Sequence, residues 1–267
     1  MHNFLRALFL SVLLTAICLC QSKDDYIIDH HQTIQNEFES SYGDGWQFSW
    51  NLNDTPHRIF GKSISQNFDG FDPFQSEIAA REFISSHQLL FNLSENSLEL
   101  WVNEQHGNLR YLIFNQVYSG IPVWNGRIDF RYRLNGDLVL IGHDAFPNLN
   151  VNTNPGVSMD QAIFYSKIHV DFDENLNDEV IGDPELYIWV EKGREPEYHL
   201  AWQLELFVHS TDPDDELPVH RWKLFIDAHS GDILEQFDEV RMATVEGHVS
   251  GPVKDEPYGV ATDRGLP

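Results

Sequence analysis

The stretch NQVYSGIPVWNG, residues 115–126, begins like a β-strand and then breaks the strand pattern. Gln116 and Tyr118 stand where a strand should continue, but Gly120 and Pro122 follow at once. Glycine weakens a strand interior, and proline donates no hydrogen bond to a ladder. We therefore expect a bend in which Gly120 allows a tight backbone and Pro122 ends the ladder. The stretch is interpreted as architectural, because it has no pattern of a nucleotide-binding or phosphate-binding loop.

Strand patterns lie on both sides of this bend. Residues 98–103 and 109–118 precede it, residues 126–134 follow it, and Asn135-Gly136 predicts a hairpin turn into residues 137–143. In the strand after the bend, apolar and charged residues alternate, which predicts one face toward the core and one toward water. The apolar set is Ile128, Phe130, Tyr132 and Leu134, and the charged set is Arg127, Asp129, Arg131 and Arg133.

Two helices are predicted ahead of these strands, over residues 26–43 and 72–90. In the second helix Asp72 is a suitable N-cap, Pro73 suits the first helical position, and Gln75 would complete a capping box. The predicted apolar side of this helix consists of Ile78, Ala79 and Phe83. The first half of the chain is therefore predicted to be a helix followed by about four antiparallel strands.

The second half of the chain repeats this plan. After a polar linker at residues 150–156, Ser158 and Gln161 predict a capping box that opens a helix over residues 159–168. Strand patterns follow at residues 185–192, 198–209, 220–227 and 233–237. The second of these has an apolar face made of Tyr198, Leu200, Trp202, Leu204, Leu206 and Val208. The sequence thus predicts an α+β fold of two tandem modules, each a helix packed on a roughly four-stranded antiparallel sheet.

The composition narrows the possible partners. Of the 267 residues 42% are hydrophobic, which is enough for a packed core in one or two domains. The 42 acidic residues outnumber the 17 lysines and arginines, for a formal charge of −25. Such a charge repels nucleic acid and anionic membranes, so we expect no nucleic-acid partner. We interpret the acidity as a solvated surface, with a specific acidic binding face as the alternative.

The N-terminus predicts export. Arg6 precedes an apolar run over residues 7–19, which is the pattern of a secretory signal peptide over residues 1–20. We therefore expect a secreted, extracellular protein with no membrane segment in its mature form. Cys18 and Cys20 lie in this leader, so we expect neither a disulfide framework nor a cysteine metal site. A lipid anchor is the less favoured alternative, because a large residue precedes each cysteine.

The chain carries no catalytic motif. A zinc protease needs two histidines one helical turn apart with a glutamate between them, and the 13 histidines include no HExxH. Asp171, Asp173 and Asn175 match the first ligand positions of an EF-hand loop, but Leu176 replaces its glycine and Gly182 its final glutamate. We therefore predict no catalytic, cofactor-binding or metal-binding residue in this chain.

Several motifs, in their order and spacing, resemble one protein family. Residues 56–61 (PHRIFG) and 115–123 (NQVYSGIPV), together with Gly126, are similar to the fungalysin/thermolysin propeptide module of secreted zinc metalloproteases. Residues 200–204 (LAWQL) and 222–234 (WKLFIDAHSGDIL) resemble the PepSY module that follows it in that family. The resemblance covers roughly residues 45–240.

This resemblance implies how the chain is divided. It predicts a signal peptide at 1–20, a fungalysin/thermolysin propeptide-like module at 21–149 and a PepSY-like module at 150–240, both modules with a cystatin-like fold. Residues 241–267 would be the strand-like start of a further, truncated domain, because apolar residues and glycine alternate over residues 245–249.

The resemblance also implies a role. In that family the proregion acts as an intramolecular chaperone and inhibitor of a C-terminal zinc metalloendopeptidase domain and is then removed by proteolysis. The expected partner is that catalytic domain in cis, which would hold the zinc and, as a further candidate, calcium. Their interface would include sheet faces and the segment leading to residue 240. The alternative is a free-standing secreted binding module or a protease inhibitor acting in trans.

Ten residues of these motifs are predicted to be structural. They are Arg58, Gly61, Gln116, Gly120, Pro122, Gly126, Trp202, Trp222, Asp227 and Gly231. Arg58 could instead be a surface cation, although an arginine in so acidic a chain should find a carboxylate partner. Direct contact with a protease domain is the alternative for the residues of the bend.

Overall fold

The computed structural model describes residues 23–215, 217–240, 250–254 and 261–265. The helices are α2 (Lys23–Tyr42), α3 (Pro73–Ser86), α4 (Gln88–Phe91) and α5 (Met159–His169), with 3₁₀ turns η1 (Glu95–Ser97) and η2 (Glu174–Leu176). The strands are β1 (Gln47–Trp50), β2 (Pro56–Ser65), β3 (Leu98–His106), β4 (Leu109–Tyr118), β5 (Ile121–Arg133), β6 (Asp137–His143), β7 (Glu179–Glu191), β8 (Glu197–His209), β9 (Val219–Asp227), β10 (Ile233–Asp238), β11 (Ser250–Lys254) and β12 (Ala261–Gly265).

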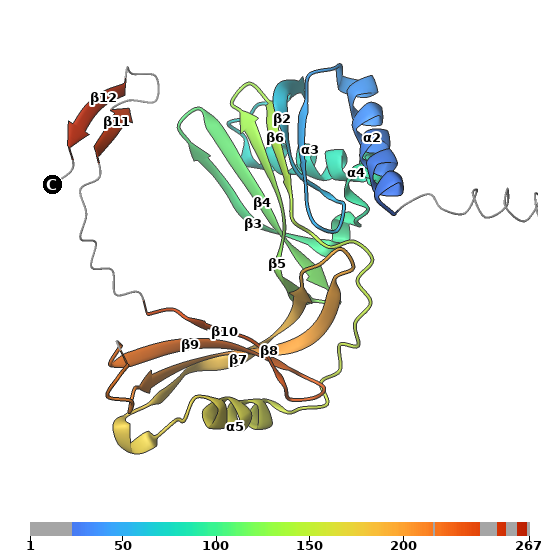
Figure 1. The fold of residues 1–267 in the computed structure, drawn as a ribbon. Coiled ribbons are helices and arrows are strands. Elements are labelled where there is room, and N and C mark those ends of the chain that lie inside the picture. Colours follow the sequence, from blue (N-terminus) through green and yellow to red (C-terminus); the bar gives the residue numbers. More distant parts are fainter. Residues whose placement is uncertain (1–22, 216, 241–249, 255–260, 266–267) are drawn as a thin grey trace, which may run out of the picture.

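Ten of these strands form one sheet. Its order is β1-β2-β6-β5-β7-β8-β9-β10, and the β3–β4 hairpin joins it through β5. The pairings are antiparallel except that of β5 with β7, where Val123 lies opposite Ile188. Figure 1 shows α2, α3 and α4 along one face of the first half of the sheet and α5 along one face of the second half. The predicted α+β class with a mostly antiparallel sheet is confirmed.

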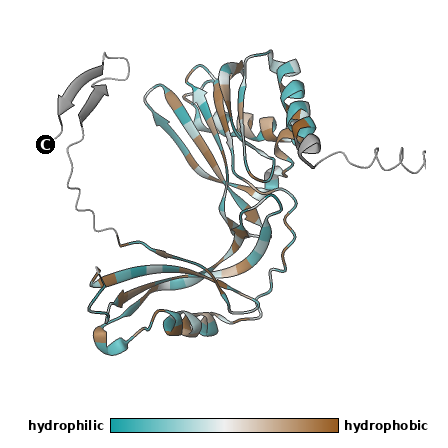
Figure 2. Ribbon diagram, viewed as in Figure 1, coloured by the Kyte–Doolittle hydropathy of each residue, from teal (hydrophilic) through white to brown (hydrophobic). Residues whose placement is uncertain are grey.

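The first half of the sheet has its own hydrophobic core, to which α2, α3, α4 and strands β2 to β6 contribute. The three apolar residues of β5 that were expected to face inward, Ile128, Phe130 and Tyr132, are fully buried. Asp129 was expected to face water and is instead buried, because arginine side chains from β2 and β5 cover it. Figure 2 shows the resulting alternation of hydrophobic and hydrophilic residues along the strands.

The buried side of α3 differs from the prediction. It consists of Ser76, Ala80, Phe83 and Ile84, whereas Ile78 is exposed. The apolar pattern of the sequence did not reveal this face, because a polar residue, Ser76, begins the buried stripe. The Ser76 hydroxyl is satisfied there by donating a hydrogen bond to the Pro73 carbonyl. Asp72 caps the helix as predicted, but the Gln75 amide donates to the Asp72 carboxylate and does not close a capping box.

The second half of the sheet packs against α5 around a separate core. Ser158 and Gln161 form the predicted capping box at the start of α5. The predicted inward face of β8 is confirmed, since Leu200, Trp202, Leu204, Leu206 and Val208 are all buried.

The structure corrects the interpretation of residues 115–126. Ser119 and Gly120 both have positive φ, +52° and +80°, and form the tight turn of the β4–β5 hairpin. Pro122 does not end the ladder, because it lies opposite Val117 at the second position of β5. A proline at the beginning of a strand leaves most of the ladder intact.

The ladder breaks one step further along. Asn115 lies opposite Arg127 and Val117 opposite Pro122, so residues 123–126 of β5 face Gln116 alone. Val123, in this bulge, belongs to the core of the second half. Ile128, just beyond the bulge, belongs to the core of the first half. Bulges bend a strand and disrupt its ladder locally, and this one lies where β5 passes from one half of the sheet to the other.

Some predicted segments lie outside the described residues. These are the signal peptide, residues 1–20, and residues 245–249 of the expected further domain. Beyond them, β11 and β12 pair antiparallel as a two-stranded sheet. No described helix has the length and apolar character needed to cross a bilayer.

Candidate functional site: a polar junction and an aromatic sheet face

The side chain of Gln116 fills the space opposite the β5 bulge. It is 1% exposed. Its Oε1 accepts a hydrogen bond from the Phe146 backbone nitrogen at 2.8 Å, and its Nε2 donates to the Phe146 carbonyl at 2.7 Å. A Cβ at Gly126 would lie 2.8 Å from Gln116 Oε1, so a larger residue there would displace this amide. Gln116 and Gly126 therefore act together to hold the chain that leaves β6.

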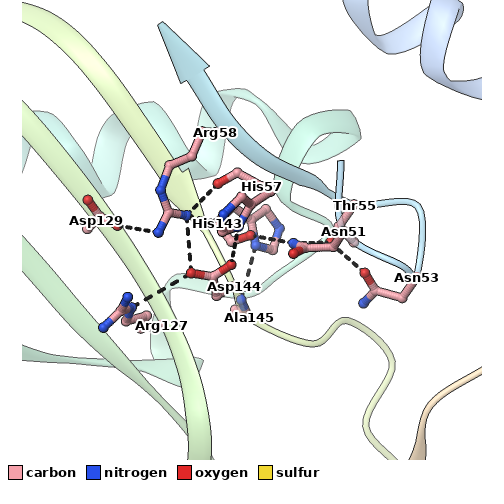
Figure 3. Close-up of polar contacts among 10 residues, drawn as sticks. All are labelled: Asn51, Asn53, Thr55, His57, Arg58, Arg127, Asp129, His143, Asp144 and Ala145. Carbon is pink, nitrogen blue, oxygen red and sulfur yellow. Dashed lines mark hydrogen bonds and ion pairs between the residues drawn. The ribbon is translucent and has the colours of Figure 1, made fainter. Parts of the chain in front are cut away.

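A charged cluster holds the same segment two residues earlier, at Asp144 (Figure 3). Arg58 Nη1 donates to Asp144 Oδ2 at 3.1 Å and to the His57 carbonyl at 2.6 Å, and Arg58 Nη2 lies 4.0 Å from Asp129 Oδ2. Asp144 Oδ1 also lies 2.6 Å from His57 Nδ1, and Arg127 lies 3.7 Å from Oδ2. Arg58 thus has carboxylate partners and is not an isolated surface cation.

His143 adds a neutral member to the cluster. Burial lowers its pKa to about 4, even though the Phe91 carbonyl and Asp144 favour the charged form. Its Nδ1 accepts from the Ala145 backbone nitrogen at 3.2 Å, so the proton lies on Nε2, 3.2 Å from the Phe91 carbonyl. The Asn51 amide donates to the His143 carbonyl at 2.8 Å. Residues 143–146 are therefore fixed by β1–β2, α4 and β4 at once.

We define this group of contacts, around residues 143–146, as the junction. A pocket of about 170 Å³ borders it, with residues 51–53 and 144–146 on one side and Lys192, Gly193 and Pro196 of the β7–β8 turn on the other. The pocket therefore lies where the two halves of the molecule meet.

Replacing Asp144 with asparagine is expected to lower the free energy of unfolding by about 1 to 3 kcal/mol at pH 7. Burial would raise the pKa of Asp144, but hydrogen bonds and charges of His57 and Arg58 hold it below its usual range. Because the folded pKa is the lower one, the stabilisation is complete above the unfolded pKa and is lost as the pH falls through the folded value.

Urea unfolding of the wild type and the Asp144→Asn variant at pH 7 and near pH 3 tests this expectation. The difference between the two proteins should shrink at the lower pH. Asp183→Asn, an exposed residue of β7 with the same change of charge, is the matched control and should change stability by less than about 0.5 kcal/mol. An equal difference at both pH values would contradict the assigned role of the carboxylate.

The face of the second half opposite α5 carries five aromatic residues, which we call the aromatic face. Phe225 is fully buried at its centre, with ring centroids of Trp189 and Trp124 at 4.4 and 4.7 Å. Tyr187 and Phe237 complete it, and Phe237 is 40% exposed. A pocket of about 410 Å³ is lined by Trp124, Trp189 and Phe237. The pocket lining also includes the charged residues Glu191, Lys192 and Glu235. Figure 1 shows α5 along the other face of this part of the sheet.

The predicted structural residues of the second half surround α5 and the β9–β10 turn. Trp202 Nε1 donates to the Val157 carbonyl at 2.9 Å. Asp227 Oδ1 accepts from the backbone nitrogens of two turn residues. Gly231 has a φ of +84°, and a Cβ there would meet the Tyr165 ring at 2.7 Å. Trp222 lies apart from them and stacks on His220.

The remaining predicted residues lie outside the junction. Gly61 has a φ of +133°, and a Cβ there would lie 2.8 Å from the Gly45 carbonyl oxygen. Gly120 belongs to the β4–β5 turn, and Pro122 lies at the second position of β5. Of the ten predicted residues, the structure therefore brings Arg58, Gln116 and Gly126 to the junction. Trp202 packs on the α5 side, and Asp227 and Gly231 hold the β9–β10 turn.

Several residues of the site were not predicted. Asp144, Asp129 and Phe146 hold the junction. The need of Arg58 for a carboxylate was the sequence signal for the two aspartates, and no sequence signal pointed to Phe146. Five histidines, His31, His57, His199, His209 and His220, lie within 3.1 Å of an aspartate oxygen. In the segment that partly matches an EF-hand loop, the Asp173 side chain caps η2 by accepting a hydrogen bond from the Asn175 backbone nitrogen.

Known protein families and solved structures give only weak matches to this chain. No profile of a known protein family matches the chain. The C-terminal domain of Bacillus megaterium YpeB aligns over 80% of this chain and 97% of its own, with 14% identity and a TM-score of 0.34. An uncharacterized protein from Eubacterium rectale aligns over 81% and 83%, with 9% identity and a TM-score of 0.35. These TM-scores are too low to support an argument.

Two curated proteins match by sequence. Bacillolysin of Brevibacillus brevis is 28% identical over 226 residues, which cover 82% of this chain and 37% of Bacillolysin. Neutral protease B of Bacillus subtilis is 24% identical over 181 residues, 64% of this chain and 32% of that protein. The resemblance predicted from the motifs is thereby confirmed: the relatives of this chain are thermolysin-type metalloproteases, and it spans about a third of their length.

Proposed function

We propose that this chain is the proregion of a secreted zinc metalloendopeptidase and acts as a chaperone and inhibitor of a C-terminal catalytic domain. One observation carries the proposal: the chain aligns over 82% of its own length with Bacillolysin but spans only 37% of that protease, and its sequence contains no HExxH. It therefore corresponds to a part of a protease that lacks the catalytic motif. We assign the zinc, and any calcium, to the catalytic domain.

The structure supports a division into two cystatin-like modules, residues 21–149 and 150–240. Each half of the sheet has its own hydrophobic core and its own helical layer. The halves share β5, which pairs with β7 at Val123, and the junction fixes the chain that connects β6 to α5. The two modules would thus present their surfaces to the catalytic domain in a fixed relation.

The aromatic face is the surface on which we expect the catalytic domain to dock. Tryptophan, tyrosine and phenylalanine are enriched in protein interfaces, and buried aromatic anchors contribute most of the binding energy. Beside the five aromatics lies a row of charges in which Arg221 and Lys223 pair with Glu205 and Glu239. Glu239 directly follows β10, so the chain leaves this module next to the same face.

Refolding and inhibition together test the proposal. A denatured catalytic domain of Bacillolysin should recover at least tenfold more peptidase activity when refolded with this chain, and the folded enzyme should be inhibited with saturation. Inhibition without any gain in refolding would favour the alternative, an inhibitor acting in trans. The absence of both effects, whether the chain is fused to the domain or added separately, would overturn the proposal.

A pair of variants locates the docking surface. Phe237→Ala on the aromatic face should weaken inhibition about tenfold or more, as expected for an interface anchor. Phe74→Ala, an exposed phenylalanine on α3, is the matched control and should leave inhibition unchanged. Equal effects of the two variants would exclude the aromatic face as the contact surface.

A further inference from the structure

Three side chains at the turn end of the β7–β8 hairpin lie within metal-binding reach of one another. Among the described residues, Glu191, Glu197 and His199 each offer one ligand atom, and these atoms all lie within 4.8 Å of one another. Glu191 and Glu197 are directly opposite in the antiparallel register, and His199 follows two residues later on the same face of β8. The two strands thus bring one imidazole and two carboxylates close together.

The imidazole is oriented by a carboxylate on the next strand. His199 Nδ1 lies 2.9 Å from Asp227 Oδ2. The other oxygen of Asp227 accepts from the backbone nitrogens of His229 and Ser230 at 2.8 and 2.9 Å.

This orientation determines which nitrogen is available. An ionised carboxylate only accepts hydrogen bonds, so His199 Nδ1 carries the proton in the neutral imidazole and Nε2 presents its lone pair. Histidines that bind metals almost always donate their other N–H to a carboxylate or a carbonyl, which fixes the tautomer and the ring. The Asp227–His199 pair has this arrangement without any further residue.

The two glutamates give an electrostatic reason for a cation. Like charges directly opposite each other on paired strands are destabilising. A divalent cation bound between Glu191 and Glu197 would offset this repulsion and would link the two strands near their turn.

We propose that Glu191, Glu197 and His199 bind one divalent transition-metal ion, for which Zn²⁺ is the best match. One imidazole nitrogen and two carboxylate oxygens are ligands that suit zinc, whereas Mg²⁺ and Ca²⁺ prefer oxygen ligands alone. Three protein ligands leave a fourth tetrahedral position for water or for a side chain of a bound partner. This inference does not depend on the proposed function.

Calorimetric titration of the metal-free full chain with Zn²⁺ tests the site. We expect saturable binding of one ion, a rise of the unfolding temperature on binding, and a shift of the His199 Nε2 resonance in the nitrogen NMR spectrum. Glu197→Gln and His199→Gln should each weaken this binding at least tenfold. Asp227→Asn should weaken it by about 10- to 100-fold, as for other residues that orient a ligand.

The control is Glu179→Gln, an exposed glutamate at the far end of β7 with the same change of charge. It should bind Zn²⁺ as the wild type does. Circular dichroism of each variant separates loss of the site from loss of the fold. Zn²⁺ affinity that is unchanged in Glu197→Gln and His199→Gln, or no saturable binding by the folded wild type, would overturn the proposal.

Discussion

Replacing Trp202 with alanine is expected to lower the free energy of unfolding by about 3 to 5 kcal/mol. Trp202 lies on the inward face of β8, is 8% exposed and belongs to the core beneath α5. Alanine would leave a cavity there and would also remove the donor that binds the Val157 carbonyl at 2.9 Å. That carbonyl lies just before the N-cap of α5, so the loss should also loosen the start of this helix.

Urea unfolding followed by circular dichroism measures the effect. Trp101→Ala is the matched control, because Trp101 lies on β3 with 62% of its surface exposed and should cost less than about 0.5 kcal/mol. Trp202→Phe keeps most of the apolar volume and loses only the hydrogen bond, so it should fall between the two. A loss below about 1 kcal/mol for Trp202→Ala would mean that this face of β8 does not carry the core.

Local sequence patterns predicted most of the strands but missed the first two. The strict alternation in β5 and β8 comes from one face packing on a core, and such strands were predicted within a few residues. β1 and β2 were not predicted. β2 is interrupted by a bulge between Phe60 and Ile64. The four consecutive residues 60–63 are exposed and include Gly61 with its positive φ, so the period of two is hidden.

The junction shows what sequence patterns leave undetermined. The motifs pointed to Arg58, Gln116 and Gly126 as structural residues. Their partners Asp144 and Phe146 are 86 and 30 residues away in the chain, and no local spacing encodes contacts of that range. Pro122 was misinterpreted for a related reason: whether a proline ends a ladder depends on its position in the strand, which the turn at Ser119-Gly120 determines.

Replacing Gln116 with leucine is expected to lower the free energy of unfolding by about 2 to 5 kcal/mol. The two residues have similar volume, so the apolar packing is nearly conserved, but the N–H and C=O of Phe146 both lose their buried partner. An unsatisfied buried backbone group costs about 1 to 3 kcal/mol, and here two are created at once. Only the amide serves both groups, because it has a donor and an acceptor on one planar end.

The Gln116→Leu variant also tests whether the junction couples the two halves. Gln116 lies opposite the bulge through which β5 passes from the first core to the second, so its loss should let the second half, with its core around Trp202, unfold separately. Urea unfolding followed separately by tryptophan fluorescence and by circular dichroism should give coincident transitions for the wild type and separated ones for the variant. Gln105→Leu, an exposed change on β3, is the control and should behave as the wild type does. A variant that keeps coincident transitions and loses less than about 1 kcal/mol would show that the β5–β7 pairing alone joins the halves, and that the conserved volume of residue 116, not its amide, is what the junction requires.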